Sequence, residues 1–508
     1  MSVLSGNCLP LIDRSDERYH ALLDFHNRLA RKDATIWGSR AAPEASTRMN
    51  WIDLPESSRE LLPQLDALCA KHREKTHIIL CGMGGSSLGP EVIARTYKRE
   101  LFILDSTDPN YIAHALKADL AKTLVIVSSK SGSTIETASM LALFTHSFLE
   151  AGLLPSAHIV VVTDPGSALD RDSRKNALTV INADPNVGGR FSVLGAFGLV
   201  PAALIGIDVS VLLDSASATK KRFLKDPQFV VDIAYAVAFL STQYVNLCDD
   251  ESALPGLSDW IEQLIAESTG KDGMGKLPVV IETMDKSIGF SVAFCGSADL
   301  VVSADLASQF IIWEWVTALV CAALSIDPFN QPNVTETKEA TAALLTRWAG
   351  TVPIFTPDAC DENIEIFGDG QSIKEALTLL IQSIPRDGYI CVMAYLDRRD
   401  DANISQIRAL LSSKSARPVT FGWGPRLLHS TGQFHKGGTR NGAFLAITGE
   451  VEKEISIEGQ SYGFKTLLTA QAMGDGQALH SRKYPLLRLH LNNRAVGIEK
   501  LISALKSL

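Results

Sequence analysis

The sequence has few cysteines, and their placement argues against two common uses of this residue. The eight cysteines are scattered over 508 residues, with no CxxC pair and no neighbouring histidines. A disulfide framework or a zinc site would need cysteines at short, regular spacings. The chain also starts without a basic segment followed by an apolar stretch, so no secretory leader is predicted. We therefore expect a protein of a reducing compartment, the cytoplasm.

An excess of basic residues and a long apolar run are missing as well. The 48 lysines and arginines face 57 acidic residues, giving a formal net charge of -9 and no basic field for nucleic acid or anionic lipid. The longest apolar run, 193–207, contains Pro201 and is too short to cross a bilayer. We expect neither nucleic acid nor membrane as a partner, and local donors would have to hold any phosphorylated ligand.

Short apolar runs alternate with longer amphipathic stretches from about residue 75 onward. Runs typical of strands lie at 77–81, 101–105, 123–127, 158–163 and 178–182. Helix-like stretches such as 134–152 separate these runs. This alternation is typical of a parallel sheet covered on both faces, so it predicts a doubly wound α/β domain.

The remaining chain divides into further blocks, with the polar, basic stretch 218–228 as a domain junction. The expected blocks are a helical N-terminal arm at 1–60, a first α/β domain at 61–217, a second at 218–380 and a C-terminal α/β extension at 381–508. In the second domain we expect helices at 229–243, 258–268 and 313–325 and a strand at 277–283.

A glycine-rich turn, GMGGSSLGP at 82–90, follows the first expected strand. Gly84 and Gly85 would let backbone N–H groups approach an anion at a helix N-terminus, and Ser86 adds a hydroxyl donor. The dinucleotide pattern fails because its third glycine is Ser87 here. The structural alternative is a tight strand-to-helix turn.

A second segment, SSKSGSTIET at 128–137, lies between the strand at 123–127 and a long helix. It offers short hydroxyl side chains and a glycine before the helix N-terminus, including Ser129, Ser131 and Thr134. Such donors can surround a phosphate at little cost in side-chain entropy. The alternative is a serine-rich capping loop, but the paired glycine turn favours an anion site.

Three more segments contain candidate catalytic residues. NVGGRFS places Arg190 beside two glycines, QLIAESTGK places Glu267 near the end of a short helix, and DPFNQPNVTETK contains Gln331 and Lys338. An arginine can offset developing negative charge, and a carboxylate can act as a general base. Each of these side chains could instead be an ordinary surface residue.

Taken in order, the five segments resemble the motifs of the glucose-6-phosphate isomerase family over 75–340. The later stretch LLHSTGQFHKGGTRNGAF, 427–444, is similar to the isomerase part of bacterial proteins in which a transaldolase precedes it. Because this chain starts too late for a transaldolase barrel, only isomerase activity is implied. The resemblance implies two sugar-isomerase (SIS) domains of flavodoxin-like, three-layer αβα topology with parallel sheets.

The resemblance also implies roles for individual residues. Arg190 would stabilise an enediolate, Glu267 would shuttle a proton, and Lys338 would assist proton movement at the ring oxygen, with Gln331 near the sugar. The phosphate would be bound by Gly84, Gly85, Ser86, Ser129, Lys130 (through its backbone), Ser131 and Thr134. No metal or cofactor is expected, because carbonyl and hydroxyl exchange within one sugar phosphate. Family members are commonly dimers, which implies a homodimer.

One departure concerns ring opening. The family uses a histidine between the glutamate and lysine motifs, but no histidine lies between Glu267 and Lys338. We hypothesise that His435 or His429 takes this part; the alternative is that both are structural.

The reaction implied by the resemblance is interconversion of glucose 6-phosphate and fructose 6-phosphate through a cis-enediolate. One alternative is isomerisation of another sugar phosphate, such as mannose 6-phosphate. A non-enzymatic alternative is a sugar-phosphate sensor, against which stand the lack of a recognisable DNA-binding segment and the presence of both Glu267 and Arg190.

Overall fold

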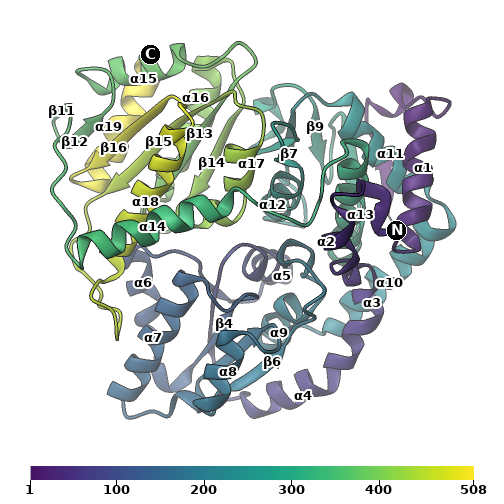
Figure 1. Cartoon of the computed structure of the whole chain (residues 1–508), viewed down its shortest axis with the longest axis horizontal. Helices are drawn as coiled ribbons and strands as arrows, with labels where there is room; N and C mark the ends of the chain where they lie inside the picture. The colour runs from purple at the N-terminus through teal and green to yellow at the C-terminus, as the bar shows by residue number, and fades with distance from the viewer. Residues whose placement is uncertain (1) are drawn as a thin grey trace. The chain divides into compact units, whose positions relative to one another are not determined.

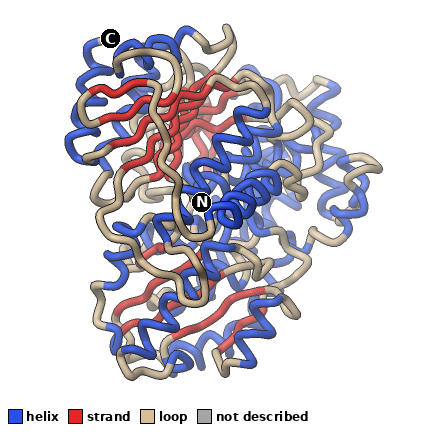
Figure 2. Tube along the Cα trace, turned by 60° about the vertical axis from the view of Figure 1, so that its left-hand side comes forward, coloured by secondary structure: helices blue, strands red, loops and turns tan. Residues whose placement is uncertain are grey.

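The computed structural model describes residues 2–508, which form three β-sheets with helices around them (Figure 2). The chain forms two compact units. Unit 1 contains the chain up to Leu104 and the stretch Ala118–Gln331, and unit 2 contains Asp105–Lys117 and Pro332–Leu508. Unit 1 holds two of the sheets and unit 2 holds the third.

The first sheet of unit 1 is entirely parallel, with the strand order β3-β2-β4-β5-β6. Two of its strands, β4 and β6, are labelled in Figure 1. Its strands are β2 (His77–Gly82), β3 (Phe102–Leu104), β4 (Thr123–Ser128), β5 (Ile159–Thr163) and β6 (Thr179–Asn182). These bounds match the five predicted runs closely. Their continuous apolar runs, buried on both faces of the sheet, explain why the sequence identified them.

The second sheet has the order β1-β10-β9-β7-β8. Four strands are parallel: β7 (Tyr244–Cys248), β8 (Leu277–Val280), β9 (Ser291–Ala293) and β10 (Leu300–Ser303). The fifth, β1 (Val3–Ser5), pairs antiparallel with β10. The N-terminal arm, expected to be helical, therefore also supplies an edge strand, which is too short for its periodicity to be recognised in the sequence.

Helices surround both sheets of unit 1, and they include the expected long helix after β4 and the helix that carries Glu267. They are α1 (Glu17–Ala30), α2 (Ala42–Ser46), α3 (Leu54–Ser57), α4 (Leu62–Lys71), α5 (Leu88–Thr96), α7 (Ile135–Glu150), α8 (Ala168–Lys175), α9 (Ala196–Leu204), α10 (Val209–Lys225), α11 (Gln228–Tyr235), α12 (Leu257–Thr269) and α13 (Leu306–Ala323).

Unit 2 contains the third sheet, of order β11-β12-β16-β15-β13-β14. The strands β13 (Tyr389–Tyr395), β14 (Val419–Trp423), β15 (Gly442–Gly449) and β16 (Leu486–Leu491) are parallel, and β11 (Ala359–Asp361) and β12 (Ile364–Phe367) are antiparallel additions. The helices are α6 (Pro109–Leu116), α14 (Val334–Trp348), α15 (Ile373–Gln382), α16 (Ile407–Ser415), α17 (Gly432–Gly437), α18 (Phe464–Ser481) and α19 (Arg494–Ser507).

All three sheets share one strand order. If the parallel strands of each sheet are numbered along the chain, the order begins 2-1-3-4 in every case. This is the flavodoxin-like order, in which ligands bind at the carboxyl edge where the strand order reverses. The expected α/β fold with parallel sheets is thus confirmed, and the C-terminal block has the same core topology as the two expected SIS domains.

The expected domain boundaries need correction. The boundary at 380/381 falls within α15, and the boundary at 217/218 falls within α10. The basic stretch 218–228 is no linker, because Lys220 is buried and donates to the carbonyl of Ile52. The chain passes into unit 2 at 331/332 instead, since α14 packs closely on α18, where Gly474 lies against Thr341.

Residues 105–117, expected within the first domain, also belong to unit 2. The buried carboxylate of Asp108 lies 2.7 Å from Arg494, and Asp105 lies 2.9 Å from Arg426. Buried charges must be paired, so these two ion pairs fix the segment to the C-terminal part of the chain. Partners more than three hundred residues apart leave no local signal in the sequence.

Helix α13 is the central apolar helix of unit 1. It is long and apolar enough to cross a membrane, but 94% of the helix is buried inside the fold, as in a core helix. Its Glu314 is fully buried, and neither carboxylate oxygen has a hydrogen-bond partner among residues 2–508. Burial raises the pKa of Glu314 well above its usual value.

This carboxyl group should make unit 1 less stable as the pH rises. Above its ordinary pKa the unfolded chain releases a proton that the folded chain keeps, so the free energy of unfolding falls by up to about 1.4 kcal/mol per pH unit. Glu314→Gln should therefore stabilise the protein more at pH 8 than at pH 5, measured by urea unfolding. The exposed Glu100→Gln serves as the control. An equal gain at both pH values would contradict the prediction.

Candidate active site

Two loops leave the first sheet of unit 1 at the point where its strand order reverses. Gly82 ends β2 and lies opposite Ser128, which ends β4. The glycine turn and the serine loop therefore start from adjacent strands at the carboxyl edge. This is the position at which open α/β sheets bind their ligands.

The serine loop, residues 129–134, offers unused donors. Ser129 is 3% exposed and its hydroxyl donates to Thr134 Oγ1 at 3.2 Å. The backbone N–H groups of Lys130, Ser131 and Gly132 donate no hydrogen bond within residues 2–508. Gly132 has a φ of 69°, which favours glycine. Free N–H groups ahead of α7 suit an oxyanion.

The side chain of Lys130 is directed elsewhere. Its Nζ donates to Asp164 at 2.5 Å and to the carbonyl of Pro185 at 3.3 Å. Burial lowers the pKa of Lys130, although the ion pair with Asp164 opposes this effect. These contacts leave the backbone N–H as the group that Lys130 can offer a ligand, which is the role that the family resemblance implies for it.

The glycine turn brings Arg190 close to the carboxyl edge of the first sheet, where the serine loop also begins. A Cβ atom on Gly85 would overlap the carbonyl of Gly189, so only glycine allows this backbone approach. Gly84 adopts a φ of 55°, and Ser86 is buried beside it. The turn thus sets the position of the short helical turn Gly189–Phe191, which carries Arg190.

Arg190 is a buried guanidinium with several acceptors in unit 1. It is 5% exposed, and its Nε donates to Ser268 Oγ at 2.9 Å. Nη1 donates to Gln331 Oε1 at 2.9 Å, and Nη2 donates to the carbonyls of Pro328 at 2.5 Å and Asn330 at 3.2 Å. Because its donors are satisfied by backbone and side chains, the guanidinium is held rigidly.

Glu267 forms an ion pair with this arginine. It lies near the C-terminal end of α12 and is 9% exposed. Its Oε1 is 3.2 Å from Arg190 Nη1, and its Oε2 accepts a hydrogen bond from Gln263 Nε2 at 3.2 Å. Two candidates chosen from separate motifs thus meet in one site, with Gln331 on the same arginine.

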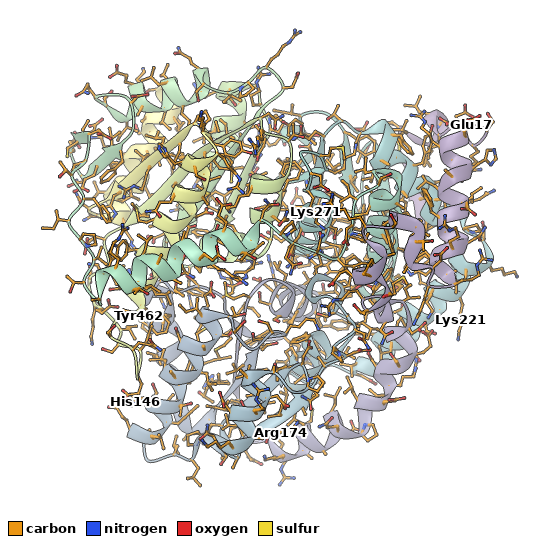
Figure 3. The ribbon with its side chains drawn as sticks, in the orientation of Figure 1. Glu17, His146, Arg174, Lys221, Lys271 and Tyr462 are labelled. Atoms are coloured by element: carbon orange, nitrogen blue, oxygen red, sulfur yellow. The ribbon has the colours of Figure 1, made fainter. Side chains whose placement is uncertain are left out.

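Lys271 is a site residue that the sequence did not predict (Figure 3). It is 2% exposed, and its Nζ donates to the carbonyl of Asp327. Burial, reinforced by the charge of Arg190, lowers the pKa of Lys271 to about 7. Lys271 and Arg190 together anchor the turn 327–331. A lysine after a helix end is usually solvated, so its burial could be recognised only from the fold.

Two other candidates lie in unit 2. Lys338 is exposed on α14, and its role rests on its motif alone. His435 in α17 is 2% exposed, with Nδ1 2.8 Å from Tyr389 Oη and Nε2 3.2 Å from Cys391 Sγ. Burial lowers the pKa of His435 to about 3. These contacts fit the structural alternative, and the catalytic role of His435 stays a prediction that the reaction proposed below does not use. His429 is half-buried.

The site lies within a segment that matches a known family. The phosphoglucose isomerase family model matches residues 66–291, a range that contains the two loops, Arg190 and Glu267. A glucose-6-phosphate isomerase from Citrifermentans bemidjiense is 38% identical over 212 residues, covering 39% of this chain and 40% of the relative. One from Campylobacter jejuni is 34% identical over 206 residues, covering 38% and 50%.

Residues 66–291 are thus similar to the glucose-6-phosphate isomerase family, and this match covers less than half of the chain. The matches span only about half the length of these relatives or less. The crystal structure of a glucose-6-phosphate isomerase from Chlamydia trachomatis superposes with a TM-score of 0.51 at 20% identity, covering 61% of this chain and 75% of that one. At that identity the likeness concerns the fold. The family match ends before Gln331, Lys338 and most of unit 2.

The contact between the glycine turn and the Arg190 turn can be tested by substitution. Gly85→Ala should lower the free energy of unfolding by about 1–3 kcal/mol, because the new methyl group meets backbone that cannot move aside cheaply. Gly189→Ala is the matched control, since a Cβ there meets nothing within 4 Å. Chemical unfolding measures both, and equal stabilities would show that the close approach is unimportant.

Proposed function

We propose that the chain catalyses the reversible isomerisation of glucose 6-phosphate and fructose 6-phosphate through a cis-enediolate, as an enzyme of the cytoplasm. The observation that carries this proposal is the buried ion pair of Arg190 and Glu267, 3.2 Å apart. Its position among loops with free N–H donors and the names of the relatives support the same reaction. A homodimer is part of the proposal.

In the proposed reaction Glu267 acts as the general base. It removes the proton from C2 of the open-chain aldose and returns it to C1, while the hydroxyl proton on O2 passes to O1, so that the aldose becomes the ketose. The hydrogen bond from Gln263 holds one carboxylate oxygen in a fixed direction. Because the side chain is almost entirely buried, the proton has little access to bulk water between the two steps.

Arg190 balances charge during the transfer. Before the reaction its positive charge faces the carboxylate of Glu267. Once that carboxylate has taken the proton it is neutral, and the negative charge lies on the enediolate oxygen of the substrate instead. A guanidinium fixed by its acceptors can stabilise that oxygen without reorganising.

The phosphate of the substrate would bind at the carboxyl edge of the first sheet. The free backbone N–H groups of Lys130, Ser131 and Gly132 would donate to it, together with the hydroxyls of Ser86, Ser129, Ser131 and Thr134. Neutral donors suit a chain whose formal net charge is -9. They position the sugar so that C1 and C2 face the carboxylate.

Glu267→Gln tests the proposal. Turnover of fructose 6-phosphate in a coupled spectrophotometric assay should fall by roughly 10²–10⁴-fold, the usual contribution of a general base. Binding of fructose 6-phosphate, followed by calorimetry, should persist because the phosphate donors are intact. Mannose 6-phosphate in the same assay tests the alternative substrate.

The matched control is Asp272→Asn, an exposed carboxylate five residues further along the chain. It should leave turnover unchanged. Undiminished turnover in Glu267→Gln would remove this residue as the base. Wild-type protein that binds the sugar phosphate without converting it would instead identify a sensor and refute the proposed enzyme.

A further inference from the structure

One face of the sheet in unit 2 carries polar side chains where apolar ones are expected. A row of cross-strand neighbours on β12, β16, β15 and β13 consists of Glu365, His490, Thr448 and Tyr395. The residues between them on β12 and β16 are buried isoleucines and leucines that point to the opposite face. A parallel sheet packed between helices is normally apolar on both faces.

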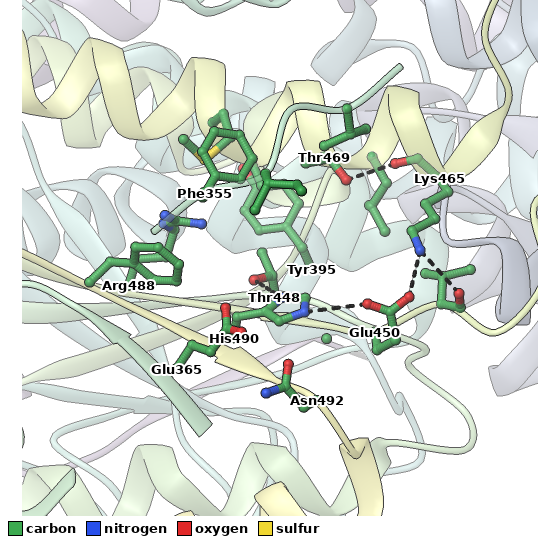
Figure 4. Close-up of a pocket in the computed structure, with 18 of the residues that line it drawn as sticks. Phe355, Glu365, Tyr395, Thr448, Glu450, Lys465, Thr469, Arg488, His490 and Asn492 are labelled. Carbon is green, nitrogen blue, oxygen red and sulfur yellow. Dashed lines mark hydrogen bonds and ion pairs between the residues drawn. The ribbon is translucent and has the colours of Figure 1, made fainter. Parts of the chain in front are cut away.

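The polar row lines a cavity of about 390 Å³ (Figure 4). Helix α18 closes it from above the sheet with Leu468 and Met473, and the segment 352–355 contributes Phe355. Tyr395 and Thr448 belong to β13 and β15, between which the strand order of this sheet reverses. The cavity therefore occupies the ligand-binding edge of the third flavodoxin-like sheet, and its size suits a small organic ligand.

Arg488 is the clearest ligand-binding group in the cavity. Its guanidinium carbon lies 3.5 Å from the ring centroid of Phe367 and 5.3 Å from that of Phe355. In the described part of the chain it has neither a hydrogen bond nor an ion pair. Burial lowers the pKa of Arg488 to about 10, so it remains charged at neutral pH. A stacked guanidinium with unused donors is preorganised for a phosphate or carboxylate.

Some of the other polar side chains in the cavity already have hydrogen-bond partners, and others do not. Lys465 Nζ donates to Glu450 Oε1 at 2.5 Å, and His490 Nδ1 lies 2.9 Å from Thr448 Oγ1. The side chains of Glu365 and Asn492 make no hydrogen bond within residues 2–508. A free carboxylate and a free amide can accept hydrogen bonds from vicinal hydroxyl groups, as an acidic residue does with a ribose.

We propose that this cavity binds a small organic phosphate of the mononucleotide class. Arg488 would hold the phosphate, Glu365 and Asn492 the ribose hydroxyls, and Phe355 with the apolar side of α18 the flat base. The apolar wall favours a nucleotide over a sugar phosphate, which would leave Leu468 and Met473 facing hydroxyl groups. This site lies wholly in unit 2 and does not depend on the reaction proposed for unit 1.

Calorimetric titration of the full chain with AMP tests the proposal. Wild-type protein should give saturable binding, and Arg488→Met should weaken it at least tenfold because the charged donors are lost. Asn492→Ala, at an exposed position that cannot disturb the core, should weaken it as well because the amide that accepts hydrogen bonds from the hydroxyl groups is lost. Circular dichroism checks that each variant is folded.

Two controls separate this site from others. Arg386→Met removes an exposed arginine of unit 2 that does not line the cavity, and it should bind AMP like the wild type. Glu267→Gln should also bind AMP normally, so a failed isomerase assay and a failed AMP titration are independent results. The proposal is refuted if AMP does not bind at about 1 mM, if both cavity variants bind it like the wild type, or if inorganic phosphate binds equally well.

Discussion

The guanidinium of Arg190 is a buried charge that neighbouring segments of unit 1 must satisfy together. Its acceptors come from the end of α12 and from the turn 328–331. Removing any one of them would leave part of a buried charge unpaired, which costs several kcal/mol. The position of Glu267 and the shape of the turn are therefore consequences of one residue, and Gly85 in turn determines where that residue can stand.

Lys271 adds a second buried basic group beside Arg190, which the sequence motifs did not predict. It anchors the carbonyl of Asp327, next to the carbonyl of Pro328 that Arg190 holds. Burial and the nearby guanidinium bring the pKa of Lys271 to about 7. Near neutrality Lys271 can therefore lose its charge. The ion-pair partner of Glu267 is Arg190, at 3.2 Å.

The hydrophobic periodicity of the sequence predicted the strands and helices that depend on neighbouring residues alone. Strands β2 and β4 and helices α7 and α12 follow from periodicity, whereas a shared site for Arg190 and Glu267 is implied only by the family resemblance. What could not be predicted depends on distant partners. Strand β1 pairs across almost the whole of unit 1, residues 105–117 are held by Arg494 and Arg426, and the burial of Lys271 requires the turn at 327.

The three sheets show how little topology alone says about chemistry. Each reverses its strand order at one point, but glycine and serine stand there in the first sheet, whereas Tyr395 and Thr448 stand there in the third. Small residues leave room for backbone donors around an anion. Larger side chains, with Arg488 stacked on Phe367, build a walled cavity instead. Charged side chains on a buried sheet face lower the stability of the fold compared with apolar ones. Binding of a ligand to the folded protein would offset this loss of stability.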